Sequence, residues 1–102
     1  MLPKHTDNPV VYTHALNGWV FLTSTSTYDG VDVGQSPEGE YVAIIVLEDN
    51  TAIEDITFSN DNYEFAPGQG IADVPLIAGN AYPALCTQVK LSGGSVLLVK
   101  ES

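Results

Sequence analysis

The sequence predicts an all-β fold, either a compact β-sandwich or a small antiparallel β-barrel, with long acidic loops and an extended N-terminal arm. Three observations lead to this prediction. Nine glycines and six prolines in 102 residues are typical of a turn-rich β chain. The apolar runs are short and rich in β-branched residues, which favour strands. No stretch has the 3.6-residue periodicity of an amphipathic helix.

The length of the chain leaves room for one domain. Residues 1–9 are polar and contain Pro3 and Pro9, so we expect an extended arm there. We assign residues 10–102 to a single β-domain. Its core would be small, and oligomerisation is a common way for such a domain to bury more area.

The first predicted strands are residues 10–12 and residues 19–22. In the second run, which begins at Trp19, both alternating sets of positions are apolar, so we expect this strand to be buried on both faces or to lie at a sandwich core. The polar tract 23–27 is compatible with β-structure and could continue the strand outward.

The middle of the chain contains the clearest strand. Residues 28–40, with three glycines and a proline, predict a long loop that could hold a weak bridge at Val31 and Val33. Residues 41–47 are nearly all apolar, rich in β-branched side chains and bounded by turn signals, which predicts a strand.

A return strand is predicted over residues 52–58, after a turn at 48–51. Ile53 is out of phase with Ile56 and Phe58 on a two-residue period, which indicates a bulge near Glu54 and Asp55. A single helical turn over residues 51–55 is the alternative.

The last part of the chain predicts a loop at 59–70 and a strand or irregular edge at 71–77, where Pro75 removes one ladder donor. Tyr82-Pro83 predicts an extended break. Residues 86–91 alternate in polarity, as one strand of a sheet does. Residues 92–95 predict a hairpin turn, after which residues 96–99 would close the sheet and lie in the layer of the 41–47 strand.

The charge balance excludes several partners. Thirteen acidic residues stand against three lysines and no arginine, a formal net charge of −10. Recognition of phosphate depends on arginine and lysine, so we expect neither nucleic acid nor an anionic membrane as a partner. An acidic exterior suits solubility or docking onto a basic protein surface.

Cysteine usage and hydropathy indicate a protein of the reducing cytosol. Cys86 is the only cysteine, so no disulfide can form within the chain. The first residues lack the apolar segment of a signal peptide. The longest apolar run, about seven residues, is too short to span a bilayer.

No catalytic, cofactor or metal residues are predicted, and we do not expect an enzyme. The two histidines, His5 and His14, and the single cysteine offer little that can converge on a metal or a nucleophile. Cys86 lies in an apolar strand, where cysteine usually acts as a small hydrophobe. Carboxylates cluster around residues 48–55 and 61–64, but their spacing is not that of an EF-hand, so solvated turns are favoured over calcium loops.

The aromatic residues allow two interpretations. Trp19 and four tyrosines could form a sugar-binding platform. They are scattered along the chain and mostly lie within apolar runs, which favours core or subunit-interface positions instead.

Residues 71–100 carry a resemblance to a known group of proteins. An apolar segment, an Ala-Gly turn and a closing pattern of Leu-Ser, Gly and Val occur at Ala78, Gly79, Leu91, Ser92, Gly94 and Val96. This arrangement resembles the C-terminal pattern of small structural proteins of tailed bacteriophages, which are capsid decoration proteins or subunits of head fibres and tails. The resemblance implies a virion building block that is trimeric or otherwise oligomeric.

The sequence hypothesis is therefore a capsid decoration protein that binds and stabilises the assembled phage head through oligomeric β-domain contacts. Its partners would be the major capsid protein or another virion protein and further copies of itself. It would lie on the outer capsid surface after assembly in the host cytoplasm. The residues expected to bind a partner are Leu2, Pro3, Lys4, His5 and Trp19. The alternative is a β-sandwich module that binds carbohydrate or calcium through the 28–40 and 59–70 loops.

Overall fold

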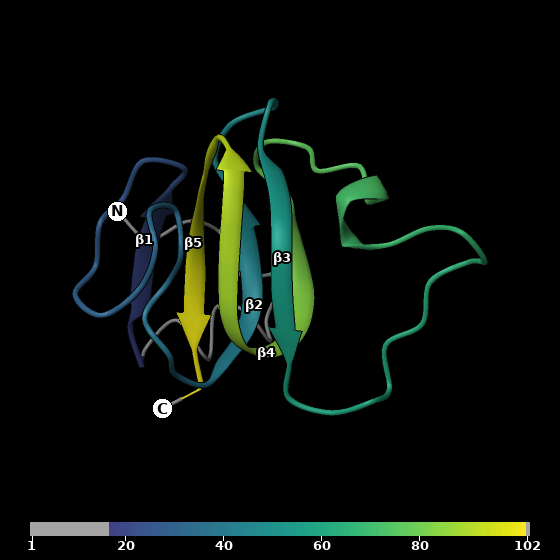
Figure 1. The fold of residues 1–102 in the computed structure, drawn as a ribbon, viewed down its shortest axis with the longest axis horizontal. Coiled ribbons are helices and arrows are strands. Elements are labelled where there is room, and N and C mark those ends of the chain that lie inside the picture. Colours follow the sequence, from purple (N-terminus) through teal and green to yellow (C-terminus); the bar gives the residue numbers. More distant parts are fainter. Residues whose placement is uncertain (1–16, 102) are drawn as a thin grey trace.

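The strands form one antiparallel sheet in the order β1-β5-β2-β4-β3 (Figure 1). The computed structural model describes residues 17–101. The fold class predicted from the sequence is confirmed: the secondary structure in this range is five strands and one short 3-10 turn. The elements are β1 (Trp19–Thr23), β2 (Tyr41–Val46), β3 (Ala52–Phe58), η2 (Ile71–Asp73), β4 (Ala81–Gly93) and β5 (Ser95–Lys100).

Strand β2 lies at the centre of the sheet, as its composition predicts. It pairs with β5 on one side and with the first part of β4 on the other. Its side chains are buried or half-buried throughout, since both edges are paired and the inner face meets the core. The prediction that residues 96–99 lie in the same layer as the 41–47 strand is confirmed, because β5 pairs with β2.

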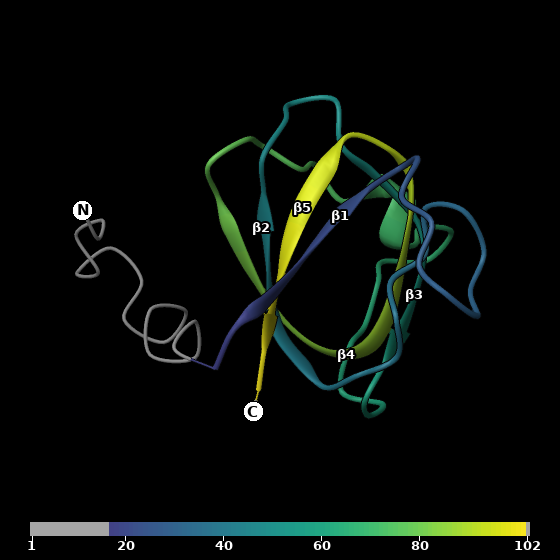
Figure 2. The same cartoon turned by 90° about the vertical axis from the view of Figure 1, so that its left-hand side faces the viewer.

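Strand β4 is thirteen residues long and curves, so that its two halves have different partners (Figure 2). Residues 81–86 pair with β2, and residues 86–93 pair with β3. The predicted break at Tyr82-Pro83 is wrong, because both residues lie inside β4. Leu85 directs its N–H to Tyr63 and its C=O to the Ser59 N–H, away from β2. Residue 83 is two positions before Leu85, so its backbone groups also point away from β2. We infer that the missing N–H of Pro83 removes no hydrogen bond to β2.

The predicted hairpin at residues 92–95 is also wrong. Strands β4 and β5 follow each other directly but are not paired, because β2 lies between them in the sheet. Gly94 instead makes a sharp corner with a φ of 76°. The side chain of Thr51 fills this corner: its hydroxyl donates to the Glu48 carbonyl (2.7 Å) and accepts from the Ser95 N–H (3.2 Å).

Strand β1 is an edge strand, and the prediction that both its faces are buried is wrong. Leu22 is fully buried, but Trp19 and Phe21 on the opposite face are 54% and 47% exposed. The strand ends at Thr23, whose N–H donates to the Ser26 hydroxyl (2.8 Å). The 23–27 tract therefore turns rather than continuing the strand.

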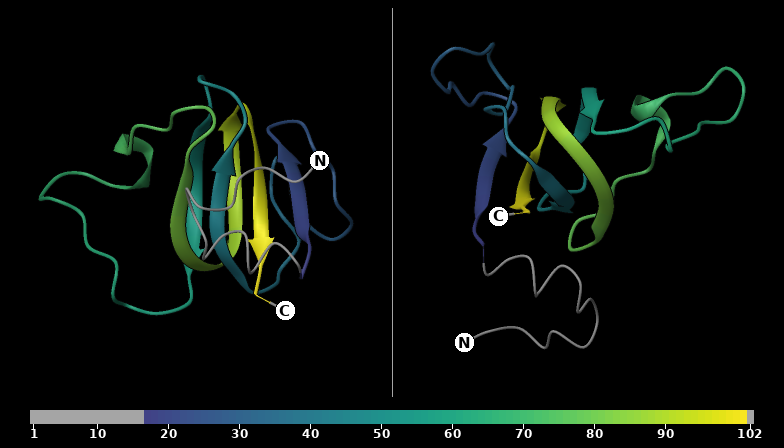
Figure 3. Two further views of the ribbon diagram at one scale, coloured as in Figure 1. Left: turned by 180° about the vertical axis from the view of Figure 1, so that it is seen from behind. Right: turned by 90° about the horizontal axis from the view of Figure 1, so that it is seen from below.

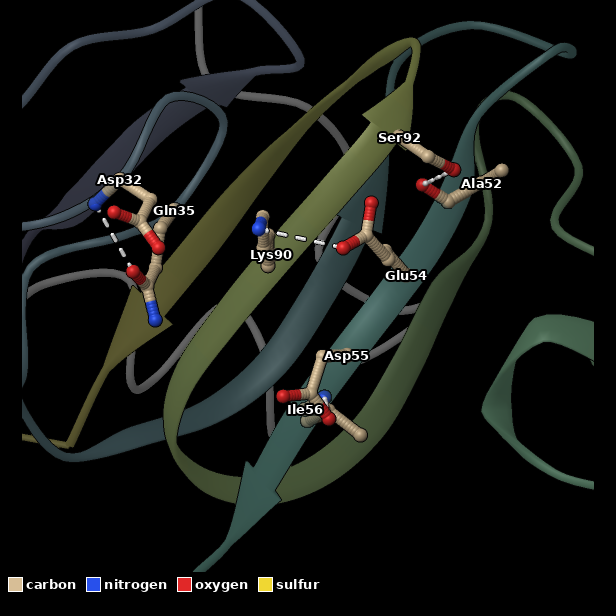
Figure 4. A network of polar contacts seen from close by, with 8 residues as sticks. All are labelled: Asp32, Gln35, Ala52, Glu54, Asp55, Ile56, Lys90 and Ser92. Carbon is tan, nitrogen blue, oxygen red and sulfur yellow. Dashed lines mark hydrogen bonds and ion pairs between the residues drawn. The ribbon is translucent and has the colours of Figure 1, made fainter.

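Strand β3 pairs with β4 and contains a register shift between Ile53 and Asp55. This confirms the predicted bulge and excludes the helical turn. Two contacts hold the irregular region (Figure 4). Asp55 accepts a hydrogen bond from the next backbone N–H (2.9 Å), and Glu54 forms an ion pair with Lys90 of β4 (3.3 Å).

The 28–40 segment is a loop, as predicted. Its bridge does not lie between Val31 and Val33, but joins Gln35 of the loop to Lys90 of β4. Ser36 is fully buried, and its hydroxyl accepts from the Val89 N–H at 3.0 Å. The loop thus lies along β4, on the side opposite to β3.

The 59–80 segment projects from the sheet beside β3 and β4 (Figure 1). The loop prediction for 59–70 is confirmed. Of the two alternatives for 71–77, the strand is wrong and the irregular segment is found: residues 71–73 form the turn η2 and residues 74–77 belong to no strand. Gly70 donates its N–H to the Asp73 carboxylate at 2.8 Å, a bond that favours the turn over an extended strand.

The core lies on the inner face of the curved sheet. Its members come from every strand and share near-complete burial; they include Leu22, Ile44, Val46, Ile53, Cys86, Val89, Leu91, Val96 and Leu98. Cys86 is a free thiol within this cluster. The inner face therefore supplies most of the packing, and the opposite face exposes the large side chains of Trp19 and Phe21.

Candidate interaction surface

The sheet presents a second apolar face, opposite the core. Cross-strand partners in an antiparallel sheet point to the same side, and two rows of partners cross β1, β5, β2 and β4. Figure 3 shows the ribbon of these strands from behind. One row joins Trp19, Val99, Ala43 and Pro83, and the other joins Phe21, Leu97, Ile45 and Ala81. We call these eight residues the outer face. None of them is charged or carries a polar group other than the Trp19 indole.

Exposure on the outer face is concentrated at its two sides. Trp19 and Phe21 on β1 and Pro83 on β4 are exposed, while Val99 and Ala43 in the middle of the first row are buried. Leu85 follows on β4 and is 40% exposed. Large apolar side chains gathered on one face are typical of surfaces that bind another protein. Two aromatic anchors at one side add to this, since aromatic residues are enriched at such surfaces.

The free edge of β1 is partly blocked against addition of another strand. Gly18 and Ser24 bond to β5 neighbours, so the alternate residues 19, 21 and 23 direct their backbone groups outward. The Phe21 carbonyl accepts a hydrogen bond from the Tyr28 hydroxyl, and both backbone groups of Thr23 bond to Ser26. Natural sheets often protect an edge in this way. The backbone groups at residues 21 and 23 are thus already bonded within the chain.

The buried ionisable groups serve packing. Burial raises the pKa of the Cys86 thiol to about 11. Burial also raises the pKa of Tyr41, whose hydroxyl donates to the Pro37 carbonyl at 2.7 Å. Since a reactive cysteine needs a lowered pKa and access to solvent, Cys86 has the chemistry of a structural residue.

Within residues 17–101, no three side chains of the types that bind metals come together. The same part of the chain has no helix that is both long and apolar enough to cross a membrane. The 28–40 loop borders an open polar hollow with Asp29 and Glu38 on its rim. The 59–70 loop borders a half-open apolar pocket instead, which is described below.

Of the residues predicted to bind a partner, the structure places Trp19 on the outer face. Leu2, Pro3, Lys4 and His5 lie outside the described residues, as do the arm at 1–9 and the predicted strand at 10–12. The sequence prediction missed the other members of the outer face. Their signal lies in the apolar residues at both alternating sets of positions in 19–22 and 96–99. Only in 19–22 was this pattern interpreted, as burial on both faces.

Comparison of the chain with family models, curated proteins and solved structures finds no match. The outer face is therefore interpreted from its own chemistry.

Proposed function

We propose that this chain is a structural interaction protein, and specifically a virion protein that decorates the outside of a phage capsid. The observation that supports this most is the uncharged outer face on a chain with a net charge of −10. The resemblance of residues 71–100 to small phage structural proteins supplies the virion context. The partners are the major capsid protein or another virion protein and further copies of the chain.

A second copy is the first occupant that we assign to the outer face, with a trimer as the favoured oligomer. Two strongly acidic molecules repel each other wherever their carboxylates approach. The eight residues of the outer face include no carboxylate, so copies can meet there with the least repulsion. Burial of the Trp19 and Phe21 side chains would supply much of the binding free energy, because aromatic anchors dominate most interfaces.

The N-terminal arm gives a second contact. Residues 1–16 contain one lysine, Lys4, and one acidic residue, Asp7, so the formal net charge of −10 belongs to the rest of the chain. Leu2, Pro3, Lys4 and His5 therefore form the part of the sequence that is best suited to approach an acidic neighbour or the shell. The acidic loops would then face outward, away from the nucleic acid inside the particle.

The oligomer is tested by light scattering on size-exclusion fractions. We expect the unaltered chain to form an oligomer and Phe21→Glu to be monomeric, because a buried unpaired carboxylate costs several kcal/mol. Val33→Glu is the matched control: Val33 is 57% exposed and lies on the 28–40 loop, away from the outer face. Circular dichroism verifies that both variants keep the β fold.

Capsid binding is tested by co-sedimentation with expanded shells of the phage that encodes the chain. We expect saturable binding, weakened by removal of residues 1–8. An unaltered chain that is monomeric and does not sediment with the shells would contradict the proposal. A Val33→Glu variant that dissociates as Phe21→Glu does would contradict the role of the outer face.

A further inference from the structure

A separate pocket lies between the inner side of the sheet and the 59–80 segment. Its volume is about 190 Å³. One wall is formed by side chains of three strands: Ile44 of β2, Ile53 and Ile56 of β3, and Ala84 of β4. Residues 63–65, 71, 74 and 76 form the other. Pro83 of the outer face also lines the pocket, but the aromatic anchors of the proposed oligomer contact, Trp19 and Phe21, do not.

The loop wall is held in place by hydrogen bonds and stacking. The Tyr82 hydroxyl donates to the Pro75 carbonyl and accepts from the Ile77 N–H, both at 3.0 Å. The Tyr63 ring stacks on Phe58 with the ring centroids 4.1 Å apart, and its hydroxyl accepts from the Leu85 N–H. The pocket is therefore formed without a ligand, which lowers the entropic cost of binding.

The lining is apolar apart from one charge. The Tyr82 hydroxyl both donates to and accepts from the backbone, and the Tyr63 hydroxyl accepts from a backbone N–H. Among residues 17–101, Glu64 is the only carboxylate that lines the pocket, and its side chain is exposed. Three aromatic rings lie close together at the pocket, those of Phe58, Tyr63 and Phe65. The ring centroids of Phe58 and Phe65 are 6.4 Å apart. Aromatic faces and a carboxylate both attract cations.

We propose that this pocket binds a small organic cation with an apolar body. An apolar cavity of about 150 Å³ is sufficient for benzene, so the present volume suits a single ring or a branched chain of similar size. The body would fill the space against the three isoleucines, and the ammonium group would lie at the rim beside Glu64. The negative charge of the whole chain favours a cation over a neutral or anionic ligand of equal size.

Three probes of similar shape separate the apolar contribution from the charge: benzylamine, benzyl alcohol and benzoate. Backbone amide shifts of the full chain, measured by NMR at constant ionic strength, give the affinities. We expect dissociation constants on the order of millimolar. Because Glu64 is exposed, we expect benzylamine to bind only about two- to five-fold more tightly than benzyl alcohol, and benzoate to bind most weakly. The shifted amides should include those of Ile56, Tyr63 and Leu85.

Glu64→Gln should bring the affinity for benzylamine down to that for benzyl alcohol and leave the alcohol unchanged. Glu38→Gln, which removes an exposed carboxylate from the other loop, is the matched control and should preserve the ranking. Ala84→Leu fills the pocket and should weaken all three probes. Equal binding of the three probes, or equal effects of Glu64→Gln and Glu38→Gln, would overturn the proposal. Because the Glu64 and Glu38 variants change only exposed side chains, their outcome decides the matter even if Ala84→Leu does not fold.

Discussion

Replacement of Gly94 by alanine should destabilise the domain far more than replacement of a glycine in a similar conformation elsewhere. Gly94 has a φ of 76°, and a Cβ added there would lie 2.1 Å from Thr51 Oγ1 and 2.4 Å from Thr51 Cα. Gly68 has a φ of 81°, and nothing lies within 4 Å of an added Cβ. Alanine at either position must adopt a left-handed backbone conformation, which lowers the free energy of unfolding. Only at position 94 does its Cβ also clash with a neighbouring residue.

The expected size of the effect follows from these contacts. The left-handed backbone conformation costs a non-glycine residue about 1–2 kcal/mol, which is the whole expected loss for Gly68→Ala. At Gly94 the overlap with the Thr51 backbone also forces that residue to move. Its hydroxyl would then lose the bonds to Glu48 and Ser95, each worth about 0.5–1.5 kcal/mol. We expect a total loss of about 2–5 kcal/mol for Gly94→Ala.

The measurement is urea unfolding followed by circular dichroism and by the fluorescence of Trp19, the single tryptophan. A domain of this size loses about 4–8 °C in Tm per kcal/mol, so thermal unfolding gives an independent value. Equal losses for Gly94→Ala and Gly68→Ala would show that the corner between β4 and β5 is not packed against Thr51 as described.

Three further predictions concern side chains. Ser36→Ala should lower the free energy of unfolding by about 1–3 kcal/mol in urea denaturation, because the Val89 N–H would remain buried without its 3.0 Å acceptor. The folded pKa of Cys86 is about 11 against an ordinary value of 9.0, so the unfolded thiol ionises first as the pH rises. The free energy of unfolding should therefore fall between pH 9 and 11, by about 2–3 kcal/mol from this group, and Cys86→Ala should reduce that slope in urea titrations at each pH. Glu54→Gln should cost less than about 1 kcal/mol and less at high salt, because the ion pair with Lys90 is half-exposed. A loss above 2 kcal/mol there would contradict this weak surface pair.

The strands that could be predicted are those whose local sequence determines their environment. Residues 41–46 form a strand buried from both edges, and their β-branched run already indicated one. The bulge in β3 followed from the phase of Ile53 against Ile56. In both cases the order of apolar and polar residues along the strand itself predicts which side chains are buried.

The errors arose where distant residues decide the structure. The glycines at 93 and 94 fit a hairpin locally, but β2 occupies the position beside β5 and Thr51 packs into the corner. Pro83 indicated a break, yet its position in β4 points away from the β2 ladder. Trp19 and Phe21 were predicted to be buried because they are apolar. An apolar side chain does not show whether it packs against its own chain or against a partner. The pocket beside the 59–80 segment depends in the same way on contacts across the fold.

The order of the strands in the sheet also affects how the chain can fold as it is synthesised. Strand β5 is made after the other four, yet it lies between β1 and β2. Strand β1 has β5 as its strand partner in the described structure, with residue 19 opposite residue 99. At about 5–20 residues per second, some seconds pass before that partner exists. During this time the side chains of Trp19 and Phe21 and the unpaired edge of β2 are exposed together. Four carboxylates of the 28–40 loop lie between β1 and β2 in the chain, and Glu48 and Asp49 follow β2. We expect their repulsion to keep neighbouring nascent chains apart, so that the net charge of −10 also protects the chain during folding.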